Sequence, residues 1–94
     1  MAFYFYILSN DTGTVLNTGV ATDLKARVDD YRAQFVPGLR VRNHTPNLVY
    51  FEAWDDEEGA LERRNDIERL SWLKKTGLIN HDNPEWLDLY YDIS

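Results

Sequence analysis

The N-terminal part of the chain alternates apolar runs with short polar segments in a way that predicts a β-hairpin. Ala2 to Ser9 is apolar, aromatic and rich in strand-forming residues, which is typical of a buried strand. Residues 10–13 contain the Asn, Asp and Gly that tight turns prefer. We therefore expect Thr14 to Gly19 to pair back on the first strand.

A helical spacing follows the hairpin. Thr22 or Asp23 can cap the free N–H groups of a helix start. Apolar residues then recur every three or four positions and form one helical face: Leu24, Val28, Tyr31 and Phe35. We expect Pro37-Gly38 to end this helix and Arg40 to Asn47 to form a loop.

The next segments predict a third strand and a second helix. Leu48 to Trp54 is apolar almost throughout, so we expect it to be the central strand of the sheet. Asp55 to Glu58 place negative charge where the N-terminal dipole of a helix favours it. The expected inner face of this helix is Ala60, Leu61, Ile67 and Leu70.

Two further helices are expected near the C-terminus. Ser71 caps a third helix that runs to about Thr76, and Gly77 ends it. Asn83-Pro84-Glu85 combines a cap, a first-turn proline and a first-turn acid, which is typical of a fourth helix start. Trp86, Leu89 and Tyr90 follow on one side of it.

The order β-β-α-β-α-α-α defines the expected fold class. A chain of 94 residues supports about one hydrophobic core, so we expect a single domain over residues 1–94. That domain is α+β, with a small three-stranded sheet flanked by helices.

The composition excludes certain kinds of site and indicates the compartment in which this domain works. The chain has no cysteine, so disulfides and thiolate metal sites are excluded. No apolar run approaches the roughly 20 residues of a membrane span, and the N-terminus lacks the basic start of a signal peptide. We expect a cytoplasmic protein with no membrane partner; its oligomeric state is left open.

The net charge of −6 bears on any nucleic-acid partner. Residues 1–40 carry four basic and four acidic side chains, whereas residues 41–94 carry six and twelve. Binding to phosphates depends on Lys and Arg displacing counterions. DNA is therefore an expected partner only through a local basic patch, and a protein partner fits the acidic balance better.

Several short segments, in this order and spacing, resemble the GIY-YIG nuclease superfamily. They are Tyr4–Leu8, Gly19–Arg27, Pro37-Gly38, Leu48–Glu52, Glu58–Arg63 and Asn83–Tyr90. The chain is similar to the small single-domain members that look like the nuclease domain of the bacterial excision-repair incision subunit. The resemblance spans Tyr4 to Tyr90 and implies the GIY-YIG endonuclease-like fold, with DNA repair as the associated process.

The resemblance implies a phosphodiester-cleaving site built from two tyrosines, an arginine, a metal-binding glutamate and a late asparagine. Tyr6 matches the first tyrosine, Arg27 the phosphate-binding arginine and Asn83 the asparagine, while Gly19 matches the second motif's glycine. These residue types suit proton transfer by a phenol of lowered pKa and phosphate binding by a guanidinium. They are the candidate catalytic residues.

Three positions depart from the family pattern. Asn17 stands where the second tyrosine is expected, Tyr31 replaces a histidine, and Arg64 replaces the metal-binding glutamate. A guanidinium removes a cation ligand and repels the metal by about 4 kcal/mol per unit charge at about 4 Å, doubled for a divalent ion. Glu68, one turn further on, is the neighbour that a shifted site would use. We expect no cofactor, and Mg²⁺ or Mn²⁺ only if the site is active.

Each candidate residue also has a purely structural interpretation. Tyr6 is a core residue by its setting, and Arg27 has Asp23 and Asp30 within reach for an ion pair. Asn83 is explained by capping alone. Arg40 and Arg42 form either a DNA-contacting loop or solvated loop charge, and the isolated His44 and His81 are typical surface residues.

The sequence therefore favours a GIY-YIG-fold domain with a degenerate nuclease site, acting as a non-catalytic nucleic-acid or protein-binding module. One alternative is a divergent metal-dependent DNA endonuclease, which requires a carboxylate near Tyr6 and Arg27. The other is a structural or interaction protein.

Overall fold

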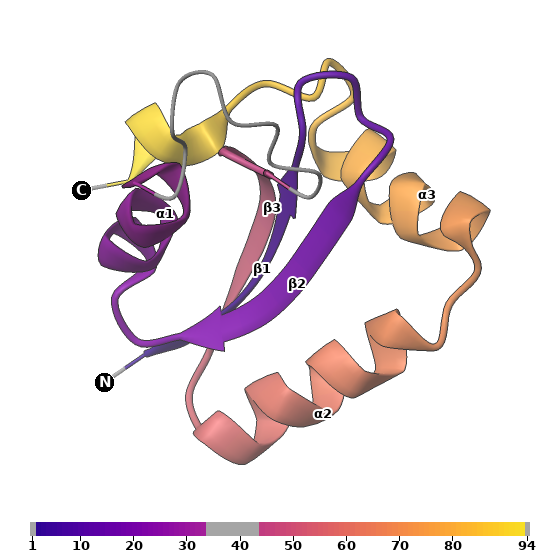
Figure 1. The fold of residues 1–94 in the computed structure, drawn as a ribbon. Helices are drawn as coiled ribbons and strands as arrows, with labels where there is room; N and C mark the ends of the chain where they lie inside the picture. Colours follow the sequence, from indigo (N-terminus) through magenta and orange to yellow (C-terminus); the bar gives the residue numbers. More distant parts are fainter. Residues whose placement is uncertain (1, 34–43, 94) are drawn as a thin grey trace.

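A computed structural model describes residues 2–33 and 44–93, which form one antiparallel sheet and the helices around it (Figure 1). Four helical segments follow or separate the three strands. The elements are β1 (Phe3–Ser9), β2 (Leu16–Ala21), α1 (Leu24–Ala33), β3 (Asn47–Trp54), α2 (Glu57–Glu68), α3 (Trp72–Asp82) and the 3-10 helix η1 (Leu89–Asp92). The predicted α+β class with a three-stranded sheet is confirmed.

The strand order is β2-β1-β3, and both neighbours run antiparallel to β1. Tyr6, in the middle of β1, lies opposite Gly19 on one side and Phe51 on the other. The expectation of a central third strand is therefore wrong: β1 is central and β3 is an edge strand. The apolar character of β3 reflects helices on both faces of the sheet rather than two flanking strands.

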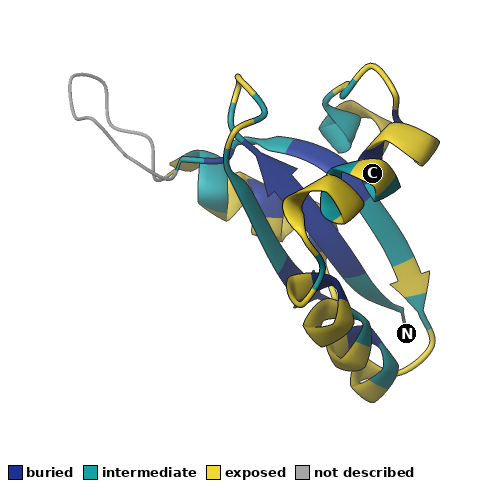
Figure 2. Cartoon of the chain, turned by 90° about the vertical axis from the view of Figure 1, so that its right-hand side faces the viewer, coloured by how far each residue is buried: buried dark blue, intermediate teal, exposed yellow. Residues whose placement is uncertain are grey.

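Side-chain alternation along β1 supplies two separate apolar layers, because successive strand residues point to opposite faces. Phe5 and Ile7 pack with Ile67 of α2 and Ile79 of α3. Tyr6 and Leu8 pack on the other face with residues of α1, while η1 lies against the same side. Figure 2 shows the buried strands between these two helical layers.

The start of α1 follows the sequence prediction. Asp23 accepts a hydrogen bond from the backbone N–H of Ala26 at 3.0 Å. Leu24 and Val28 are buried and Tyr31 is half-buried, as the spacing indicated. The expected inner residue Phe35 and the expected stop at Pro37-Gly38 lie outside the described residues.

In α2, Asp56 is the capping residue and accepts from the N–H of Gly59 at 2.5 Å. Ala60 and Ile67 are buried, and Leu70 packs against their layer. The prediction for Leu61 is wrong, since this side chain is 38% exposed. One residue corresponds to a turn of about 100°, which carries Leu61 away from the face that Ala60 presents to the sheet.

The structure corrects both C-terminal helix predictions. Ser71 caps α3 as expected, but the helix continues through Gly77 to Asp82. Burial of Ile79 outweighs the roughly 1 kcal/mol that an interior glycine costs a helix. Asn83 ends α3 instead of starting a fourth α-helix, and the helix that follows within residues 84–93 is η1, capped by Asp88. None of the helices in the described part of the chain is long and apolar enough to cross a membrane.

Candidate functional site

Tyr6 is at the centre of the candidate site, with its side chain 1% exposed. It lies across the β1–β2 pair from Gly19. A Cβ added at Gly19 would lie only 2.3 Å from the Tyr6 hydroxyl oxygen and 2.6 Å from the adjoining ring carbon. Gly19 is therefore required on steric grounds, since its missing side chain leaves the space that the phenol occupies.

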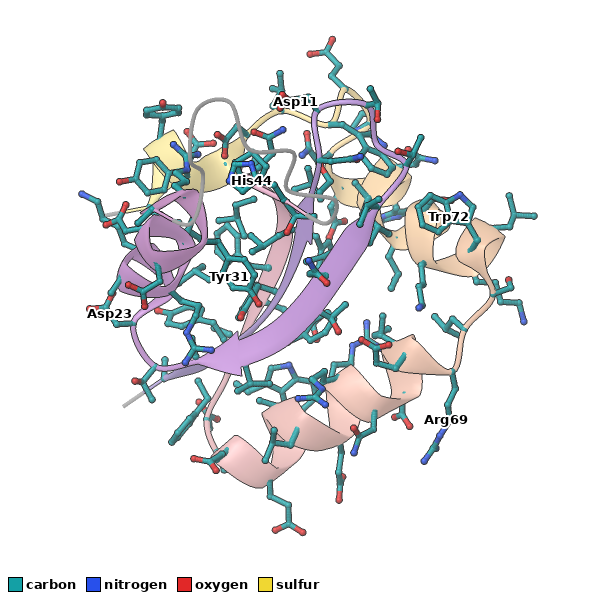
Figure 3. The ribbon with its side chains drawn as sticks, viewed as in Figure 1. Asp11, Asp23, Tyr31, His44, Arg69 and Trp72 are labelled. Carbon is teal, nitrogen blue, oxygen red and sulfur yellow. The ribbon has the colours of Figure 1, made fainter. Side chains whose placement is uncertain are left out.

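Two side chains of α1 reach the Tyr6 hydroxyl. Tyr31 lies on the side of α1 that faces the sheet (Figure 3), and Arg27 approaches one helical turn earlier. Burial and the neighbouring Tyr31 raise the pKa of Tyr6 above its usual value, and the cationic Arg27 offsets this only in part. The structure thus brings Tyr6, Arg27 and Tyr31 together and keeps the Tyr6 phenol protonated at neutral pH.

Arg27 itself is exposed. The ion pair with Asp23 or Asp30 does not form, since neither carboxylate lies within ion-pair distance of the Arg27 guanidinium in the described part of the chain. Asp23 is occupied with the helix cap instead. Arg27 therefore presents a guanidinium to solvent next to a buried phenol, an arrangement that suits an anionic ligand.

Asn17 lies two residues before Gly19 on β2 and therefore on the same face of the sheet as Tyr6. It is half-buried and donates a hydrogen bond to the Thr45 hydroxyl at 2.9 Å. Thr45 is fully buried just before β3. At the position where a second tyrosine was expected, the amide connects two segments of the fold.

Arg64 and Glu68 are the two residues that bear on whether the site can bind a metal ion. Arg64 is exposed on α2. Glu68 accepts a hydrogen bond from the Thr18 hydroxyl and forms an ion pair with Lys75 at 3.9 Å. Thr18 precedes Gly19 on β2, so it points to the opposite face from Tyr6. The carboxylate that a shifted site would use is thus directed away from the phenol and is already bound.

These residues do not fit a divalent cation beside Tyr6. The groups that interact with its hydroxyl are a guanidinium and a second phenol, whereas Mg²⁺ prefers carboxylate and carbonyl oxygens. Within residues 2–33 and 44–93, no group of three His, Asp or Glu side chains is placed to hold a metal ion.

Asn83 uses its amide to hold the chain after α3. Its Nδ2 donates to the carbonyls of Val49 at 3.1 Å and Leu87 at 2.9 Å, and its Oδ1 accepts from the Leu87 N–H at 3.0 Å. The side chain is 6% exposed. These bonds fasten the C-terminal segment to β3, which is a structural role different from the helix cap expected from the sequence.

The remaining candidates are not part of this cluster. His81 is exposed and contacts Asp82 at 2.8 Å, while His44 is half-buried just before β3. Asp56, from the acidic run at the start of α2, is a helix cap. Arg40 and Arg42 lie outside the described residues.

Sequence reasoning missed a polar network around Glu52. This carboxylate accepts from Tyr50 at 2.5 Å, from the Trp54 indole at 2.9 Å and from Arg63 of α2 at 2.8 Å. Burial acts to raise the pKa of Glu52, but these bonds outweigh it and lower the pKa. Burial, together with the bond to Glu52, raises the pKa of Tyr50 to about 12. The sequence feature that could have indicated this network is Glu52 itself, a lone acidic residue in an apolar strand.

Comparison with known proteins places this α+β domain in a family. No protein-family model matches the chain. A UPF0213 protein from Natronomonas pharaonis is 36% identical over 78 residues, which are 81% of this chain and 88% of that protein. The solution NMR structure of a UPF0213 protein from Bacillus halodurans matches with a TM-score of 0.58 and 26% identity, covering 94% of this chain and 93% of the other. The chain belongs to the UPF0213 family.

Proposed function

We propose that this chain is a GIY-YIG-type domain that has lost metal-dependent cleavage and acts as a binding module. The ordered segments from Tyr4 to Tyr90 support the family assignment, as does the sheet register that pairs Tyr6 with Gly19. Retention of the fold without its chemistry is physically reasonable, because a scaffold and the site it carries can change independently.

The observation that carries this proposal is the placement of Glu68. Cleavage requires a carboxylate that holds a cation close to the phenol and the arginine. Arg64 replaces the metal-binding glutamate that the resemblance implies, and Glu68, one turn further on α2, is bonded to Thr18 and Lys75 on the opposite face of the sheet. A cation beside Tyr6 would be repelled by the guanidinium of Arg27 without a compensating ligand.

The state of the Tyr6 phenol supports the same conclusion. A general base works best when its pKa lies near the working pH. The pKa of Tyr6 is instead raised, principally by burial, so the hydroxyl keeps its proton at neutral pH. Tyr6 then donates or accepts hydrogen bonds and contributes to the core, and it is a poor general base at neutral pH.

The exposed Arg27 indicates what the site still binds. Its guanidinium next to a hydroxyl suits a phosphate group, including one in a nucleic-acid backbone. The net charge of −6 opposes long-range attraction of DNA, so this binding is expected to be weak and to fall steeply with salt. The second candidate function is a divergent endonuclease, which the retained contact between Tyr6 and Arg27 favours.

A Mn²⁺ titration followed by NMR tests the metal argument. In the parent chain, we expect no selective broadening of the Gly19 and Arg27 amides up to about 1 mM Mn²⁺, which corresponds to binding weaker than about −4 kcal/mol. Arg64→Glu is expected to produce that broadening, because the resemblance implies a metal-binding glutamate at this position.

Arg69→Glu is the matched control, since Arg69 directly follows α2 and its side chain is 78% exposed. It makes the same change of charge without placing a carboxylate at position 64. Selective broadening at Gly19 and Arg27 in the parent, or equal broadening in both variants, would contradict the proposal.

A further inference from the structure

A groove with no assigned role lies between the end of β3 and α2, on the face of the sheet opposite Tyr6. It has a volume of about 500 Å³. One wall is the end of β3, and the other is a single stripe of α2 with the spacing of one helical face. Its lining residues are Glu52, Ala53, Trp54, Gly59, Glu62, Arg63 and Asp66, and we call it the β3–α2 groove.

The groove adjoins a strand edge that is only partly covered. At the beginning of β3, the Leu48 N–H donates to Asp88, and the Val49 carbonyl accepts from Asn83. Residues 50–54 pair with β1 on their inner edge, and in the described part of the chain their outer edge has no partner strand and no backbone hydrogen bond. An exposed edge of this kind is a template for an added strand.

The charge of the groove defines what fits it. The lining contains three carboxylates and one guanidinium, that of Arg63. This guanidinium forms an ion pair with Glu52 at 2.8 Å. Glu62 is exposed, and the exposed carboxylate of Asp66 contacts the exposed guanidinium of Arg69 at 3.6 Å. The lining is therefore negative, with the half-buried indole of Trp54 as an apolar and aromatic surface against which a cationic side chain can pack.

We propose that the β3–α2 groove binds an extended, Lys- or Arg-bearing segment of a protein partner. The segment pairs with the outer edge of β3 as a fourth strand, and alternate basic side chains enter the groove beside Glu62 and Asp66. Backbone pairing supplies general affinity, and the acidic lining selects positive charge. This surface lies on the other side of the sheet from Arg27, so the inference stands whether or not the Tyr6 site binds phosphate.

The test uses the full chain and a synthetic eight-residue peptide of alternating Lys and Val, with an alternating Glu and Val peptide as its counterpart. NMR titration should show saturable shifts at Ala53, Gly59 and the Trp54 indole with the Lys peptide only. The affinity should fall as salt is raised. Methylating alternate peptide nitrogens on the pairing edge should weaken binding by about tenfold or more, because the strand pairing is lost.

The double variant Glu62→Lys, Asp66→Lys should bind the Lys peptide about tenfold or more weakly than the parent chain does. Its matched control is Asp30→Lys, Glu85→Lys, which makes the same charge change at exposed positions outside the groove and should bind within about twofold of the parent. Thermal unfolding confirms that each variant is folded.

Three results would overturn the inference: no saturable shifts with the Lys peptide, equal weakening by the two double variants, or shifts centred on Arg27. If the methylated peptide bound as tightly as the unmethylated Lys peptide, the pairing of an added strand with β3 would be wrong.

Discussion

Gly19→Ala is expected to lower the free energy of unfolding by about 3 kcal/mol, the upper part of the range for overpacked cores. The added methyl group would lie 2.3 Å from the Tyr6 hydroxyl oxygen. Tyr6 is held in place by the strands on both sides and by α1, so the ring has little freedom to move away. Urea unfolding monitored by circular dichroism measures the change.

The control is Gly77→Ala on α3. A Cβ at Gly77 has no neighbour within 4 Å, and the residue is inside a helix. This substitution should raise the free energy of unfolding by about 1 kcal/mol, because alanine favours the helix and restricts the unfolded chain. If Gly19→Ala changed stability by less than about 0.5 kcal/mol, as surface substitutions do, the close approach of Tyr6 to Gly19 would be wrong.

Asn83→Ala is expected to lower the free energy of unfolding by a similar amount, about 3 kcal/mol. It removes three hydrogen bonds worth about 1 kcal/mol each, to Val49 and to both backbone groups of Leu87. Because these bonds fasten the C-terminal segment to β3, amide exchange should accelerate throughout residues 84–93. Exchange measured by NMR, together with urea unfolding, checks both effects.

The comparison variant is Asn80→Ala, which removes one exposed hydrogen bond from the Trp86 indole and should cost less than about 1 kcal/mol. Comparing these two variants also distinguishes a structural role of Asn83 from a role in ligand binding. If Asn83→Ala left stability unchanged but reduced binding at Arg27, Asn83 would belong to the ligand site, as the resemblance implies, and its structural role would be wrong.

Local chemistry was sufficient to predict the first part of the fold. The apolar run in β1, the turn after it and the Asp23 cap act over a few residues, so the hairpin and α1 follow from them. The same holds for the Ser71 cap of α3 and for the acidic run that begins α2, in which the structure shows Asp56 to be the cap.

The errors arose where distant contacts outweigh local preference. Gly77 normally ends a helix, but burial of Ile79 extends α3 beyond it. Asn83 has the chemistry of an N-cap, and its bond to Val49, 34 residues away, fixes a different role. The edge position of β3 depends on pairing order, which hydrophobicity alone does not specify.

The proximity of Tyr6 and Arg27 was predictable from the sequence, but the electrostatics around them were not. The resemblance selected Tyr6 and Arg27, and the structure brings them together. The raised pKa of Tyr6 depends on burial and on Tyr31, and the engagement of Glu68 depends on Thr18, 50 residues away. Neither could be read from sequence spacing, yet both bear directly on whether the site cleaves DNA.

The most direct test of the central claim is cleavage of plasmid, flapped and branched DNA with Mg²⁺ or Mn²⁺. The parent chain should give no product, whereas the double variant Asn17→Tyr, Arg64→Glu should cut, because it restores the second tyrosine and the metal-binding glutamate that the resemblance implies. Cleavage by the parent that Tyr6→Phe and Arg27→Ala both abolish would contradict the account and identify the chain as a divergent endonuclease.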